Sequence, residues 1–203
     1  MRGTGWQDST GISGSFNRNV QAHESALDIG SGLGLFSYKI SSIFKEVLSL
    51  EPDQKSIDYS KTQYGGLPNV VYLNDSFMEY NFTDQKFDFV AAIASIHHMD
   101  FASSLEKMRS LLNPGGKIII LGLYKESSVT DLIISLIAIL PNFILNLLSK
   151  KNERQDCDMI TAFPTMTIKE IKNAASEILK KYRFRRHLFW RYSIQYESDS
   201  SPQ

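Results

Sequence analysis

Apolar and polar residues alternate along this chain in blocks that predict strands separated by helices. Apolar stretches typical of strands lie at residues 25–29, 46–50, 69–73, 87–94 and 117–123. Segments with helical spacing or one polar face lie between them, at 35–44, 54–64 and 103–112. Parallel neighbours need a crossover connection, so this order predicts an open α/β sheet with helices on both faces.

The last third of the chain predicts one more helix and the closing strands. Thr167 followed by Glu170 forms a capping-box pattern, so we expect a helix over 167–181. Residues 183–197 are aromatic and β-branched enough for one or two strands. We therefore expect a flexible N-terminal arm at 1–24, a single domain at 25–197, and a tail at 198–203.

An apolar segment at 132–148 raises the question of membrane contact. It is short for a membrane span, and Pro141-Asn142 interrupts it. We expect buried or lid helices within an apolar helical insert at 128–150, and not an integral membrane protein.

Composition narrows the class of protein. The 203 residues include 22 basic and 22 acidic side chains, giving zero formal net charge, which disfavours a dedicated nucleic-acid binder. The single cysteine, Cys157, excludes an internal disulfide framework and a cysteine-rich zinc site. This cysteine usage fits a reducing, cytoplasmic location.

A glycine cluster follows the first strand in the order Asp28, Gly30, Ser31, Gly32, Gly34. Glycines remove Cβ atoms where a ligand must touch the backbone, and the next helix start offers free N–H groups. A tight turn without a ligand is the alternative. The dinucleotide pattern G-x-G-x-x-G fails here because its third glycine would fall at Leu35 or Ser37. A nicotinamide or flavin site is therefore disfavoured, whereas Asp28 could accept a hydrogen bond from an ammonium group.

Acidic residues follow the next two strands. Glu51, followed by Pro52, lies 19 positions after Gly32, near the separation at which an acid meets a ribose hydroxyl pair. Asp75 follows the third strand and could accept from an exocyclic amine, with Phe77 near the base. Ligands of such sheets bind beyond the carboxyl ends of the strands, where these residues would lie.

These segments resemble the ordered motifs of class I S-adenosylmethionine-dependent methyltransferases, in particular the group that acts on small molecules. The resemblance is carried by residues 27–34, Glu51, Asp75, the sequence FDFVAAIASIHHM at 87–99 and LLNPGGK at 111–117. It covers about residues 25–123. Together with the strand pattern it implies a doubly wound, mostly parallel, seven-stranded Rossmann-like sheet with an antiparallel closing strand.

The resemblance also implies S-adenosylmethionine as cofactor and a role for each matching residue. The residues placed around the methionine part are Asp28, Gly30, Ser31, Gly32 and Gly34. Glu51, beside Pro52, would take both ribose hydroxyls. The adenine would be read by Asp75 with the N–H groups of Ser76 and Phe77, and Ala94 would face the sulfonium end.

His97 and His98 follow the fourth strand and are the candidate general bases, with His98 preferred. Their alternative role is structural, as imidazoles packed under the loop. No metal site is expected, because adjacent histidines rarely face one ion.

The function expected from these motifs is methyl transfer to a small-molecule acceptor, by a protein that could form a homodimer. One alternative is an RNA or protein methyltransferase that uses the basic, aromatic segment 180–191 for docking. That segment also fits an edge strand with one charged face, which the zero net charge favours. A second alternative is a protein that binds S-adenosylmethionine without catalysis.

Overall fold

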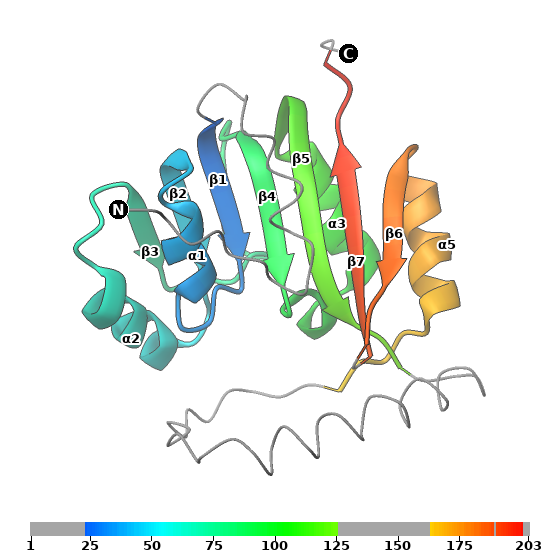
Figure 1. Cartoon of the computed structure of the whole chain (residues 1–203), viewed down its shortest axis with the longest axis horizontal. Helices are drawn as coiled ribbons and strands as arrows, with labels where there is room; N and C mark the ends of the chain where they lie inside the picture. Colours follow the sequence, from blue (N-terminus) through cyan, green and yellow to red (C-terminus); the bar gives the residue numbers. More distant parts are fainter. Residues whose placement is uncertain (1–22, 126–162, 189, 201–203) are drawn as a thin grey trace, which may run out of the picture.

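The computed structural model of the protein describes residues 23–125, 163–188 and 190–200 (Figure 1). The described residues form a seven-stranded sheet in the order β3-β2-β1-β4-β5-β7-β6. The strands are β1 (His23–Ile29), β2 (Phe44–Leu50), β3 (Val70–Leu73), β4 (Phe87–Ile93), β5 (Leu112–Leu123), β6 (Tyr182–Arg186) and β7 (Arg191–Glu197). Strand β7 pairs antiparallel with both β5 and β6, whereas the other pairs are parallel. The predicted fold class, including its antiparallel closing strand, is confirmed.

Helices cover both faces of this sheet (Figure 1). The helices α1 (Leu35–Ile40) and α2 (Gln54–Tyr64) lie over β1, β2 and β3 on one face. On the other face lie the short helix η2 (Ile96–His98), α3 (Phe101–Ser110) and α5 (Ile168–Ile178). A capping box at Thr167 and Glu170 starts α5, as predicted.

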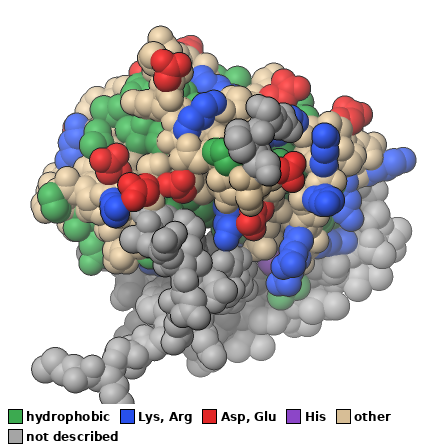
Figure 2. Space-filling model, turned by 90° about the horizontal axis from the view of Figure 1, so that it is seen from above, with side chains coloured by type: hydrophobic (Ala, Val, Ile, Leu, Met, Phe, Trp, Pro, Cys, Tyr) green, Lys and Arg blue, Asp and Glu red, His purple; other side chains and the backbone are tan. Residues whose placement is uncertain are grey.

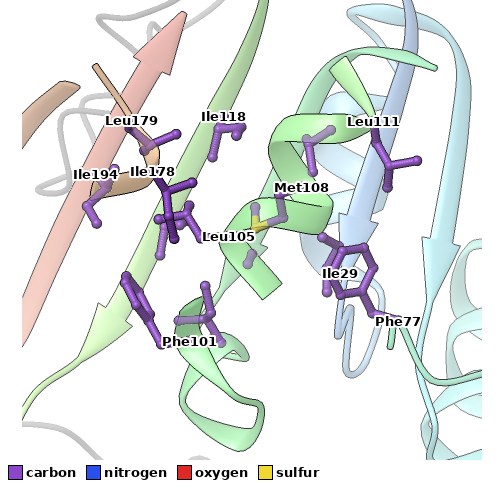
Figure 3. Close-up of a cluster of buried hydrophobic side chains, with 14 of the residues drawn as sticks. Ile29, Phe77, Phe101, Leu105, Met108, Leu111, Ile118, Ile178, Leu179 and Ile194 are labelled. Carbon is purple, nitrogen blue, oxygen red and sulfur yellow. The ribbon is translucent and has the colours of Figure 1, made fainter. Parts of the chain in front are cut away.

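Each face has its own apolar core. The larger cluster joins the sheet to α3 and α5 and includes Leu105, Ile118 and Ile194, all fully buried (Figure 3). The smaller cluster joins Ile40 of α1 to the opposite face of the sheet. Complete burial of one such side chain contributes roughly 1.5–3 kcal/mol, so these clusters hold the strand ends in fixed relative positions.

Two element boundaries differ from the sequence prediction. The helix expected over 35–44 ends at Ile40, because Phe44 is buried in the smaller cluster and stacks on Phe89, with the two ring centroids 5.2 Å apart. Tertiary packing thus overrides the helical spacing of the apolar residues. The strand expected at 117–123 begins earlier, at Leu112, so the sequence Asn-Pro-Gly-Gly at 113–116 lies within β5. Phe87 pairs with Leu112 and Phe89 with Lys117, so the intervening residues of β5 bulge out of register.

Parts of the predicted domain organisation lie outside the described residues, namely the arm up to residue 22, and the apolar insert at 128–150 with the whole of 132–148. The predicted boundary at 24/25 lies within β1, and the one at 197/198 lies at the end of β7. The beginning of the predicted tail is described, and Ser198 donates from its backbone N–H to the Gly116 carbonyl at 2.9 Å. Within the described ranges, no helix combines the length and apolar character needed to cross a bilayer.

Candidate functional site

The predicted cofactor residues meet at one edge of the sheet. The strands β3, β2, β1 and β4 are consecutive neighbours and parallel, so their carboxyl ends share this edge, the lower one in Figure 1. Asp75, Glu51, the glycine loop at 30–34 and Ala94 follow these four strands. The expectation that topology brings these segments together is therefore met.

Glu51 holds the glycine loop. One carboxylate oxygen, Oε2, accepts from the Gly32 backbone N–H at 2.8 Å, and Oε1 accepts from the Asp53 N–H at 3.0 Å. The Gly30 and Ser31 N–H groups both donate to the Leu50 carbonyl, at 2.8 and 3.1 Å. The loop after β1 is thus fixed to the end of β2. An ionised carboxylate has about four acceptor sites, so Glu51 keeps capacity for further donors.

Only one of the three loop glycines faces open space. Gly30, Gly32 and Gly34 have left-handed φ angles of 66°, 51° and 76°. A Cβ at Gly30 would lie 2.4 Å from Ser95 Cβ, and one at Gly34 would lie 2.6 Å from Ser60 Oγ. A Cβ at Gly32 would meet no atom of the described residues within 4 Å. Packing against Ser95 and Ser60 is thus one reason for glycine at positions 30 and 34, whereas the side of Gly32 is open among the described residues. The assignment of all three glycines to ligand contact stays a prediction.

Two further residues along this edge have unusual environments. Ser31 Oγ is buried and has no hydrogen-bond partner among the described residues, so its capacity to donate and accept hydrogen bonds is unused by them. Ala94 is exposed and left-handed, with φ 57°, and its N–H donates to the Leu121 carbonyl at 2.7 Å. Such strain in a non-glycine residue costs about 1–3 kcal/mol and is concentrated at functional sites.

Asp28 lies beneath the loop, with only 1% of its surface exposed. The Ser37 hydroxyl donates to its carboxylate, and Ser37 Oγ lies 3.0 Å from Ser49 Oγ. Burial raises the pKa of Asp28 to about 7, with the Glu51 carboxylate adding to the increase and the Ser37 hydrogen bond opposing it. Its predicted contact with a ligand ammonium stays a prediction, because the structure gives this carboxylate an interior partner. The serine partners were not identified from the sequence.

The segment after β3 is tied to the segment after β2. Asn74 Nδ2 donates to the carbonyls of Glu51 and Pro52, at 3.1 and 2.8 Å. Sequence analysis missed Asn74, although its position directly before Asp75 was a usable signal. Asp75 is half-buried, and its Oδ1 accepts from the Ser76 N–H at 2.7 Å.

Phe77 was expected near the base of the ligand. Its ring is 3% exposed and belongs to the larger core cluster (Figure 3). The side chain therefore anchors the segment after β3 in the core. Only its backbone remains for the predicted role.

The two histidines differ in environment. Their rings lie 4.3 Å apart, and His98 is exposed whereas His97 is half-buried. His97 lines a cavity of about 20 Å³ together with Met99 and Thr165, and its Nδ1 is buried without a partner among the described residues. Burial, and secondly His98, lower the pKa of His97. The His97 ring is thus partly packed under the loop, whereas the His98 ring is exposed, and the choice between them as general base stays a prediction.

The basic segment near the C-terminus contains an edge strand. In β6, Arg183 and Arg185 are exposed, whereas Tyr182, Phe184 and Arg186 are half-buried. Figure 2 shows Lys and Arg side chains gathered on the β6 side of the molecule. This alternation is typical of a charged edge strand. Among the described residues there is no group of three or more His, Cys, Asp or Glu that could hold a metal ion.

Comparison with known proteins finds similarity mainly in the central segment of the chain. Residues 27–120 match the family model described as "Methyltransferase domain". A demethylmenaquinone methyltransferase of Oceanobacillus iheyensis is 29% identical over 107 residues, which cover 50% of this chain and 45% of the relative. The O-methyltransferase cnsE of Penicillium expansum is 26% identical over 113 residues, covering 53% of this chain and 41% of the relative. The match thus spans less than half the length of these relatives.

Solved structures share the fold over most of the chain. The complex of DhpI with SAH superposes with a TM-score of 0.59 at 16% identity, covering 86% of this chain and 77% of that one. The N-methyltransferase NodS from Bradyrhizobium japonicum, in complex with S-adenosyl-L-homocysteine, gives 0.60 at 11% identity, covering 87% and 79%. At these identities the likeness establishes the fold.

The loop glycines provide a matched pair of substitutions. Gly32→Ala should cost about 1–2 kcal/mol of unfolding free energy, because only its left-handed backbone opposes a side chain. Gly30→Ala should lose roughly 1–3 kcal/mol more, because its methyl group also overlaps Ser95. Urea denaturation measures both, and equal losses would contradict the packing explanation.

Asp28 should make stability depend on pH. A carboxyl whose pKa is raised on folding is protonated in the folded state between its two pKa values, so stability falls as pH rises through that window. We expect the unfolding free energy of the wild type, relative to Asp28→Asn, to fall by about 3 kcal/mol between pH 5 and pH 8. Urea titrations at both pH values measure it. The exposed Asp58, replaced by Asn, is the control, and a pH-independent difference for Asp28→Asn would refute the assignment.

Proposed function

Residues 27–120 match a methyltransferase domain, and from that premise we propose that the protein is a class I S-adenosylmethionine-dependent methyltransferase that methylates a small-molecule acceptor. One observation carries the cofactor assignment. The Glu51 carboxylate accepts from the N–H of Gly32, and Gly32 is the loop glycine whose Cβ position is open among the described residues. The names of the matched relatives, a demethylmenaquinone methyltransferase and an O-methyltransferase, support a small-molecule acceptor.

The residues present fit the chemical groups of S-adenosylmethionine. Glu51 has acceptor capacity for a ribose hydroxyl pair, and Asp75 can accept from the adenine amine. The open side of Gly32 and the unpartnered Ser31 Oγ suit the methionine part. Bound there, the cofactor would supply a methyl group on a sulfonium, which is already a good leaving group.

The chain's own contribution to such a reaction is alignment and exclusion of water. Ser95, which follows the strained Ala94, fixes the loop after β4 beside the glycine loop, because its Oγ donates to the Ile29 carbonyl at 2.5 Å. His97 could hold the acceptor's proton. Its lowered pKa keeps the imidazole neutral at neutral pH, which is the form that accepts a proton.

The proposal also covers the cellular location, the class of acceptor and the oligomeric state of the protein. The single cysteine supports a cytoplasmic location. The zero net charge and the alternating edge strand β6 favour a small-molecule acceptor over RNA. A homodimer is compatible with the proposal and is tested by sedimentation.

Cofactor binding tests the first part of the proposal. Calorimetry should show micromolar binding of S-adenosylmethionine and none of NADH. Glu51→Gln should weaken the affinity roughly 10- to 100-fold, because a charge-assisted contact becomes neutral. Glu46→Gln, an exposed change in the preceding strand β2, is the control. Unchanged affinity in Glu51→Gln would remove the ribose assignment, and absence of wild-type binding would refute the cofactor.

Transfer of labelled methyl groups to a panel of phenols, quinols and amines tests the second part. A base works when deprotonated, so activity should fall as pH drops through the lowered pKa of His97. His97→Asn should reduce the rate about 10²- to 10⁴-fold and remove this acidic limb, whereas His98→Asn should keep it. The reverse result would restore His98 as the base. Cofactor binding without transfer to any acceptor would favour the non-catalytic alternative.

A further inference from the structure

Lys107 on α3 binds the segment that follows β3, at residues 76–80. Its ammonium donates to two backbone carbonyls of that segment, Met78 O at 3.0 Å and Tyr80 O at 3.1 Å. The lysine is half-buried, so these charge-assisted bonds are partly shielded from water. A second link from α3 joins the same segment, because Ser104 Oγ lies 3.4 Å from Met78 Sδ.

The segment that Lys107 binds forms a tight turn. The backbone N–H groups of Glu79 and Tyr80 both donate to the Ser76 carbonyl, at 3.1 and 2.8 Å. Asp75, which precedes the turn, bonds the Ser76 N–H. A displacement of residues 78–80 would therefore also displace Ser76 and the Asp75 carboxylate that is bonded to it.

Aromatic rings hold Lys107 in place. Its ammonium lies 5.2 Å from the ring centroids of both Phe77 and Phe82, within the range of a cation–π contact. These two rings pack edge to face at 5.8 Å, and both belong to the larger core cluster. Removing the lysine from water lowers its pKa, and the charge of Asp75 opposes that effect, so the ammonium lies within the field of that carboxylate.

We propose that Lys107 is a positioning residue that fixes Asp75 for recognition of the adenine amine, an inference that rests on the proposed cofactor site. Lys107 lies on α3, and its bonds go to the carbonyls of the turn. It acts by holding the turn against α3, so that the Asp75 carboxylate is oriented before the ligand arrives. Its effect should therefore depend on the base of the ligand.

The test compares two ligands and three variants. S-adenosylhomocysteine carries the adenine amine, and its deaminated analogue S-inosylhomocysteine has a carbonyl in that place. Lys107→Met should weaken S-adenosylhomocysteine binding about tenfold and the inosyl analogue less than threefold, by calorimetry. Lys107→Arg, which keeps a cation with several donors, should restore the affinity to within about threefold.

Lys86→Met is the matched control. Lys86 also donates to a backbone carbonyl, that of Ser110, which is the last residue of α3 and not part of the turn. Its removal should leave both affinities unchanged. If Lys107→Met weakens both ligands equally, or neither, or if the wild type binds the two ligands equally well, the proposal is overturned.

A ligand-free measurement separates this inference from the proposed function. Hydrogen exchange at the Glu79 and Tyr80 amides should be at least about tenfold faster in Lys107→Met than in the wild type or Lys86→Met. If the wild type binds no S-adenosylhomocysteine, the proposed function fails and the adenine part of this inference fails with it. Faster exchange would then still support Lys107 as the residue that orders the turn, and unchanged exchange would refute that as well.

Discussion

The hydrogen bonds that join the ends of β1 and β2 are the constraint on which the candidate site depends. The Leu50 carbonyl accepts from Gly30 and Ser31, and the next residue, Glu51, takes the Gly32 N–H. These bonds convert the chain after β1 into a fixed bend rather than a mobile loop. Because Ser95 Oγ also donates to the Ile29 carbonyl, the end of β4 is fixed to the same point. Three strand ends therefore form one rigid edge, and a ligand there need not order them.

Much of this arrangement could be predicted from the sequence, because it follows from local pattern and topology. The helix over 54–64 was predicted with its observed bounds, since Asp53 caps it and Gly65 follows it. The order of glycines and acids at successive strand ends sufficed to place Glu51 and Asp75 at one edge. Parallel pairing then brings those ends together without any knowledge of side-chain contacts.

What the sequence could not supply depends on tertiary packing. The spacing of the apolar residues predicts Phe44 as the last residue of a helix, but the stacking of its ring on Phe89 favours its position in strand β2. The packing reasons for Gly30 and Gly34 depend on Ser95 and Ser60, which are distant in sequence. Lys107 reads as an ordinary surface lysine of an amphipathic helix, and only the fold brings the Met78 and Tyr80 carbonyls to it.

The bulge of β5 also determines where residues 198–200 leave the sheet. Gly115 donates to the Asp199 carbonyl, and Ser198 bonds both Gly116 and Asn113, so the polypeptide leaves the sheet beside this bulge. That exit lies at the top of Figure 1, and the candidate site lies at the opposite edge. A surface linker attached at Ser200 would hence leave the candidate site facing the solution. The bulge thus makes the segment at residues 198–200 a suitable point of attachment for surface-based ligand screening.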